Sequence, residues 1–146
     1  MPDILHRVGV ASTPEPVFAA LTTIDGLAGW WTDSVEGEAD AGGALVLRFG
    51  ADELDILVVE HDAATRVAWE VTGGPREWIG TRILWDLRGE DDQTTIVFAH
   101  QLWREQVEFM HQCSTKWATF LFSLKSLVES GAGAPYPRDV RVSNWG

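Results

Sequence analysis

Residues 105–129 read EQVEFMHQCSTKWATFLFSLKSLVE, and this stretch decides the fold that the sequence predicts. Its large apolar side chains recur every three or four residues, a spacing that places them on one face of a single long helix. Gly131 follows the stretch and suits a helix end, because glycine adopts the left-handed backbone conformation without strain. The apolar face needs a large partner, and it consists of Met110, Cys113, Trp117, Phe120, Leu121, Leu124 and Val128.

The residues before this helix predict six strands. Apolar and polar side chains alternate along them, and glycine-rich or polar turns such as Gly42-Gly43 and Gly73-Gly74-Pro75 separate them. Short connections between successive strands favour antiparallel pairing. The predicted strands span residues 4–11, 44–49, 54–61, 67–71, 79–87 and 95–102.

Two short helices are predicted between the first and second of these strands. Thr13 suits the N-cap of the first helix and Pro14 its first position, and the second helix runs from about Asp25 to Trp30-Trp31. This order of elements predicts an α+β domain in which a curved antiparallel sheet wraps around the long C-terminal helix. A sheet that curls around a helix without touching it everywhere leaves a cavity between the two, and that cavity would be the functional feature of the fold.

The chain has 146 residues, which suits one domain. We expect this domain to occupy residues 1–131. Residues 132–146 contain glycine and prolines and show no periodicity, so they predict an irregular C-terminal tail on the surface.

The net charge is −11, with 22 acidic and 11 basic side chains. Such a surface repels phosphate backbones and anionic lipids, which argues against nucleic-acid binding and against membrane association. No apolar stretch is long enough for membrane insertion. Cys113 is the only cysteine, so an intrachain disulfide is excluded, and the N-terminus has no signal-peptide pattern. These observations predict a soluble, cytoplasmic protein.

Several short motifs, taken in order, resemble the START-like, helix-grip (SRPBCC) superfamily. The chain is most similar to bacterial relatives of the heat-shock-protein-ninety ATPase activator, which are grouped with polyketide cyclases and birch-pollen-allergen-like proteins. The resemblance covers about residues 4–130, and one position departs from it, because Lys116 stands where the family often has glycine. The matching segments are STPEPVFAAL (12–21), Trp30-Trp31, Gly42-Gly43, Val59-Glu60, RVAW (66–69), GTRI (80–83), His100, and Lys116-Trp117 with Leu121, Leu124 and Glu129.

The resemblance implies a pocket for a small hydrophobic or aromatic ligand between the sheet and the C-terminal helix. The chain has eight tryptophans, and flat aromatic walls suit a planar ligand. The same side chains could instead simply fill the core, because alternation does not distinguish a cavity wall from packed interior. The predicted ligand-binding residues are Trp30, Leu47, Phe49, Trp69, Trp78, Ile83, Trp85, Phe98, His100, Met110, Trp117, Phe120 and Leu124.

His100 is the one candidate for catalysis. It is predicted to point inward at the end of a strand, where it could serve as an acid or base toward a ligand. We favour the alternative of a core histidine that binds a backbone carbonyl or a carboxylate. His6 lies on the inward face of the first strand, and closure of the sheet could bring it near His100.

Other chemistry-bearing residues predict no site. Glu108 and His111 form a single Glu-x-x-His pair, which favours a solvated first helical turn over metal binding. Cys113 lies on the apolar face and is expected to pack there rather than act as a nucleophile. The carboxylates at residues 52, 53 and 55 belong to a hairpin turn, and the paired glycines lack the context of a phosphate-binding loop. We therefore predict no metal and no cofactor.

Three functions remain open from the sequence. We favour a non-catalytic protein that binds a small apolar molecule, because the aromatic residues have no convincing catalytic partner. A cyclase or dehydratase that uses His100 is the enzymatic alternative. A chaperone-regulating or other protein-interaction module is implied only by the family resemblance. A homodimer is also conceivable, although no residue marks an interface.

Overall fold

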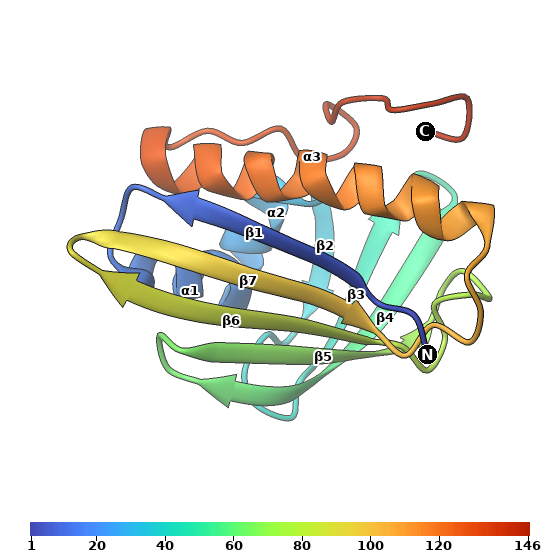
Figure 1. Cartoon of the computed structure of the whole chain (residues 1–146), viewed down its shortest axis with the longest axis horizontal. Helices are drawn as coiled ribbons and strands as arrows, with labels where there is room; N and C mark the ends of the chain where they lie inside the picture. Colours follow the sequence, from blue (N-terminus) through green and yellow to red (C-terminus); the bar gives the residue numbers. More distant parts are fainter.

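Seven strands form one antiparallel sheet in the order β1-β7-β6-β5-β4-β3-β2 (Figure 1). The structure is a computed structural model and describes residues 1–146. Hairpins connect β3 through β7 in sequence, and β1 joins the outer edge of β7, with Ile4 opposite His100. The strands are β1 (Ile4–Val10), β2 (Ser34–Gly37), β3 (Ala44–Phe49), β4 (Asp52–Asp62), β5 (Arg66–Gly73), β6 (Arg82–Glu90) and β7 (Gln93–Gln101).

Three helices cover one face of the sheet. α1 (Pro14–Thr22) and α2 (Ile24–Trp30) follow β1, and the long α3 (Glu108–Ser130) runs alongside β1 (Figure 1). None of these helices combines the length and the apolar character needed to cross a bilayer. The arrangement confirms the predicted α+β helix-grip fold.

Local sequence signals explain where these helices begin and end. Pro14 occupies the first turn of α1, where no backbone N–H is needed. The Thr23 hydroxyl accepts a hydrogen bond from the Gly26 N–H and caps α2. Gly131 ends α3 in the left-handed conformation with φ of 86°, and its N–H donates to the Leu127 carbonyl, as predicted for this position.

The structure adds one strand to the prediction and shifts several predicted boundaries. β2 was not predicted, because SVEG is a short, mostly exposed edge segment without an apolar alternation. β6 begins at Arg82 rather than residue 79, because Trp78 to Thr81 form a turn in which the Thr81 N–H donates to the Trp78 carbonyl. α3 begins at Glu108, three residues later than predicted.

The outer face of the sheet carries the charged side chains that alternate with the core residues. Arg48 forms an ion pair with Glu36, and Arg82 forms one with Glu60, which also pairs with Arg66 at 2.6 Å. Arg48 and Arg82 thus bind neighbouring acids on the outer surface. Exposed pairs of this kind contribute about 0–1 kcal/mol to stability.

The core between the sheet and the helices is built around Trp85. Its ring meets those of Trp30 and Trp69 edge-on at 5.6 Å between centroids, and that of Phe98 at 4.8 Å. All four side chains are buried. Edge-to-face aromatic pairs of this kind add about 0.5–1.5 kcal/mol each beyond the burial of their surface. The centre of the sheet–helix interface is therefore packed with aromatic rings.

Residues 132–146 pass over α2 and α3 without forming a helix or a strand (Figure 1). The Tyr136 N–H donates to the Trp31 carbonyl at 2.9 Å, and the Asp33 N–H donates to the Tyr136 carbonyl at 3.1 Å. Arg138 holds the Asp33 carboxylate with two hydrogen bonds of 3.0 Å. This tail is therefore fixed against the start of β2, and the division of the chain at residue 131 stays a prediction.

Candidate functional site

A groove of about 1100 Å³ opens at one end of the interface between the sheet and α3. Four segments form it: the first half of α3, the turn from β3 into β4, the loop from β5 to β6, and the tail. Trp31 lies at its base, immediately after α2. Eight aromatic side chains line the groove: Trp31, Phe49, Trp78, Phe109, Trp117, Phe120, Tyr136 and Trp145.

These aromatic side chains hold one another in fixed orientations. Trp78 and Trp117 stack with centroids 5.9 Å apart and an angle of 14° between their planes. On the other side, Phe49 meets Tyr136 edge-on at 5.7 Å and lies 6.4 Å from the Phe120 ring at a tilt of 58°. Because every ring of the groove except Trp145 is packed against another ring, the walls are preorganised rather than free to collapse.

The charged groups of the groove are mostly acidic. Asp52, Glu53, Asp55 and Asp139 line it, against Lys116 and Arg141 as the basic side chains. Lys116 forms an ion pair with Asp139 and donates hydrogen bonds to the Val140 carbonyl at 2.6 Å and the Gly146 carbonyl at 3.1 Å. Lys116, which departs from the family pattern, therefore holds the tail in place as one wall of the groove.

His100 lies in the core behind the groove and does not line it. Its Nδ1 is 3.2 Å from Trp117 Nε1, which can only donate, and its Nε2 is 2.8 Å from the Thr81 hydroxyl. That hydroxyl donates to the Trp78 carbonyl at 2.6 Å, so Nε2 of His100 carries the proton and donates to it. Burial lowers the pKa of His100 to about 3.

This geometry favours the core role of His100 over the acid or base role. Both ring nitrogens are engaged with protein groups, and the imidazole stays neutral over the ordinary pH range because burial disfavours its charged form. The sequence predicted that His100 lies in the core, and the structure places it there. Its hydrogen-bond partners are a hydroxyl and an indole N–H rather than the predicted backbone carbonyl or carboxylate. His100 instead orients Trp117 and Thr81 behind the groove.

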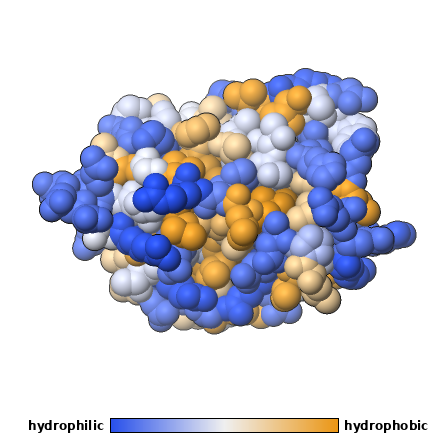
Figure 2. Space-filling view, viewed as in Figure 1, coloured by the Kyte–Doolittle hydropathy of each residue, from blue (hydrophilic) through white to orange (hydrophobic).

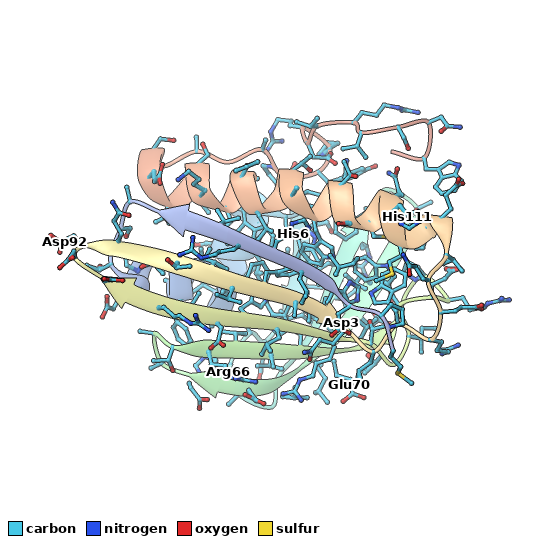
Figure 3. All side chains as sticks on the ribbon, viewed as in Figure 1. Asp3, His6, Arg66, Glu70, Asp92 and His111 are labelled. Atoms are coloured by element: carbon cyan, nitrogen blue, oxygen red, sulfur yellow. The ribbon has the colours of Figure 1, made fainter.

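His6 does not reach His100, although both lie on the inward face of adjacent strands. The register places His6 opposite Phe98, and its Nε2 lies 3.1 Å from the Ser114 carbonyl of α3. Figure 3 shows His6 between β1 and α3. Its role is therefore to join the edge strand to the helix.

Four of the predicted ligand-binding residues line the groove: Phe49, Trp78, Trp117 and Phe120. The other nine are buried in the core and do not line it. Alternation identified the inward face correctly, but cavity wall and packed interior share that face, and only the position along each element separates them. The nine core residues are Trp30, Leu47, Trp69, Ile83, Trp85, Phe98, His100, Met110 and Leu124.

Sequence reasoning missed several groove residues. Tyr136 and Trp145 belong to the tail, which has no periodicity that could have placed them. Phe109 lies in the first turn of α3, and Trp31 follows α2 in the paired tryptophan motif. The sequence contained one sign that the tail contacts the domain. The only tyrosine of the chain and a tryptophan lie in this glycine- and proline-rich segment, and large aromatic side chains favour burial against a partner.

The remaining sequence candidates offer no reactive group. Burial raises the pKa of the Cys113 thiol to about 12, and this outweighs the Trp78 indole N–H, which donates to the sulfur at 3.4 Å and lowers the pKa, so Cys113 stays protonated. Glu108 and His111 border a smaller hollow of about 360 Å³ beside the tail, and Figure 3 shows His111 near the start of α3. No three side chains among His, Cys, Asp and Glu gather closely enough to hold a metal ion.

A curved sheet, a long C-terminal helix and a groove between them define a helix-grip protein. The profile of the family described as "Activator of Hsp90 ATPase homolog 1-like protein" matches residues 11–129, and the chain belongs to this family. This confirms the resemblance inferred from the sequence motifs. A comparison with curated protein sequences gave no match.

Solved structures agree with this assignment. The Aha1 dimer from Colwellia psychrerythraea is 40% identical over 91% of this chain and 100% of that chain, with a TM-score of 0.84. SSP2350 from Staphylococcus saprophyticus is 20% identical over 97% of this chain and 98% of that chain, with a TM-score of 0.76. DynU16, a protein of the dynemicin biosynthetic locus, is 22% identical over 92% of this chain and 49% of that chain, with a TM-score of 0.77. The last two similarities concern the fold alone.

Proposed function

We propose that this protein binds a small apolar or aromatic molecule in the groove between the sheet and α3. The observation that carries the proposal is the set of eight aromatic side chains around a space of about 1100 Å³. Pockets for small molecules have similar volumes, mostly apolar walls and a few polar groups. Covering this aromatic surface is favourable by about 25 cal/mol per Å² removed from water.

The chemistry of the groove supports binding rather than catalysis. Cys113 is held as a thiol, and the Lys116 ammonium is engaged by the tail. His100 lies behind the wall with both nitrogens occupied. The cyclase or dehydratase alternative therefore loses the residue on which it rested, and we propose a carrier or sensor.

Replacing Phe49 by Ala is expected to weaken ligand binding about tenfold, because it removes a ring that contacts two other walls of the groove. Titration of the intrinsic tryptophan fluorescence with a panel of lipids, planar aromatic compounds and polyketides measures the effect. Trp78, Trp117 and Trp31 line the groove, so a bound ligand changes their emission.

Phe122→Ala provides the matched control, because Phe122 is 61% exposed on α3 and does not line the groove. This variant is expected to bind like the wild type. The proposal is wrong if no compound of the panel changes the emission of the wild type, or if both variants lose affinity equally.

We further propose that the chain forms a homodimer, as the 40% identical relative does. We place the interface on the outer face of β5, β6, β7 and β1, where hydrophobic residues are interspersed with hydrophilic ones (Figure 2). Leu5 is 68% exposed there, and it lies opposite Ala99, which in turn lies opposite Leu84. A chaperone-regulating role rests on the family description alone, and a cytoplasmic location stays a prediction.

Sedimentation velocity is expected to show a dimer for the wild type and a monomer for Leu5→Glu, since a buried carboxylate at the interface is unfavourable. Phe122→Glu adds the same charge on exposed α3 and is expected to remain dimeric. A wild type that stays monomeric at high protein concentration would refute the homodimer.

A further inference from the structure

We propose that the ligand of the groove carries a positive charge: an aromatic or apolar molecule with a basic or quaternary nitrogen. This inference rests on the proposed binding function and adds the chemical class of the ligand. Three independent features of the groove support it: the ring faces, the engagement of Lys116 by the tail, and the unpaired carboxylates.

The aromatic walls themselves favour a cation. The face of a tryptophan, tyrosine or phenylalanine ring carries partial negative charge and attracts a cation within about 6 Å of its centroid. The groove already contains one example, because Lys116 Nζ lies 5.5 Å from the centroid of Phe120. Trp78, Trp117 and Tyr136 line the same space.

The groove offers few free cationic groups to an anionic ligand. An ammonium has three donors, and those of Lys116 have three acceptors in the tail: the Asp139 carboxylate and the carbonyls of Val140 and Gly146. The side chains of Asp139 and Lys116 are only 8% and 21% exposed, so little of this ion pair is accessible from the groove. Arg141 donates its Nε hydrogen to the Ser143 carbonyl and forms no ion pair, so it is the one basic side chain of the groove that is open to an anion.

The carboxylates at the turn into β4 are less fully paired than the Lys116 ammonium. Glu53 lies 3.6 Å from Arg48, whereas Asp52 and Asp55 form none of the salt bridges of the chain. Oδ1 of Asp55 is buried and has no hydrogen-bond donor in the protein. Because this oxygen is shielded from solvent, the Asp55 carboxylate acts on a bound cation through its charge rather than through a direct hydrogen bond. The net charge of −11 also raises the local concentration of cations at the groove.

Isothermal titration calorimetry with three naphthalenes of similar shape tests the inference: trimethyl(1-naphthylmethyl)ammonium, neutral 1-naphthylmethanol and anionic 1-naphthylacetate. We expect the affinity for the cation to be about fivefold higher than for the neutral probe and at least about tenfold higher than for the anion. The preference is expected to shrink as salt is raised from about 0.02 M to 0.2 M, because exposed charges are screened.

Asp55→Asn, alone and combined with Asp52→Asn, is expected to remove most of the preference for the cation and to leave the affinity for 1-naphthylmethanol unchanged. Asp86→Asn is the matched control, because it removes the same charge from β6 at a residue that does not line the groove. This variant is expected to keep the wild-type preference.

The outcomes separate this inference from the proposed function. If the neutral probe binds as tightly as the cation, or the anion binds best, the charge preference is wrong and the binding function stands. If none of the three probes binds, both the binding function and the inference are wrong. A preference that survives in the double variant would show that Asp52 and Asp55 do not cause it.

Discussion

Lowering the pH from about 6.5 to about 3 is expected to remove about 4 kcal/mol of stability through His100 alone. Burial lowers the pKa of this histidine from 6.5 to about 3, so the unfolded chain takes up a proton within this window while the folded protein does not. The stabilisation from neutral His100 is therefore complete above pH 6.5 and is lost as the pH falls toward 3. Each pH unit inside the window changes the free energy of unfolding by up to about 1.4 kcal/mol.

Urea unfolding of the wild type and of His100→Gln, measured at several pH values, isolates this contribution. Glutamine does not titrate, so the stability advantage of the wild type over His100→Gln is expected to shrink as the pH falls. His111→Gln, at an exposed position of α3, is expected to keep the wild-type pH dependence. Identical pH dependence in the wild type and His100→Gln would contradict the buried, neutral state of His100.

Replacing Trp85 by Ala is expected to lower the free energy of unfolding by about 3–5 kcal/mol. Trp85 is fully buried, and its ring contacts the rings of Trp30, Trp69, Phe98 and Trp117. Removing the ring leaves a cavity that this rigid aromatic cluster does not refill, because the neighbouring rings are also fixed by one another. Urea denaturation followed by far-UV circular dichroism measures the loss.

Two further variants test the cause of this loss. Trp145→Ala removes a ring that is 54% exposed and is expected to change stability by no more than about 0.5 kcal/mol. Trp85→Phe is expected to cost less than Trp85→Ala, because a ring remains and Trp85 Nε1 has no hydrogen-bond partner to lose. Equal losses in Trp85→Ala and Trp145→Ala would contradict the central position of Trp85.

The sequence determined the fold almost completely, and the reason is local periodicity. The spacing from Met110 to Val128 marked α3, and alternation marked six of the seven strands. Gly131 and Pro14 fixed helix ends through backbone conformation alone. The missed strand β2 is short, exposed and paired only at one edge, so it owes its structure to β3 rather than to its own side chains.

The groove could be predicted only in part from the same patterns. Phe49, Trp78, Trp117 and Phe120 were placed on the correct face, but so were Trp69, Trp85 and the other residues that fill the core. Which of these residues line the groove depends on the distance of each residue from the centre of the interface between the sheet and α3. That distance depends on how the twisted sheet separates from α3 at one end.

The periodicity of the chain by itself determined which side chains face inward, because facing inward depends only on the repeat of a helix or a strand. The tertiary structure decided what those side chains contact. In the folded chain His100 packs against Thr81 and Trp117, and Lys116 binds the tail. The fold also leaves Oδ1 of Asp55 without a hydrogen-bond donor. These contacts join segments far apart in the chain. No local repeat encodes them, and they form only when the sheet and α3 have come together.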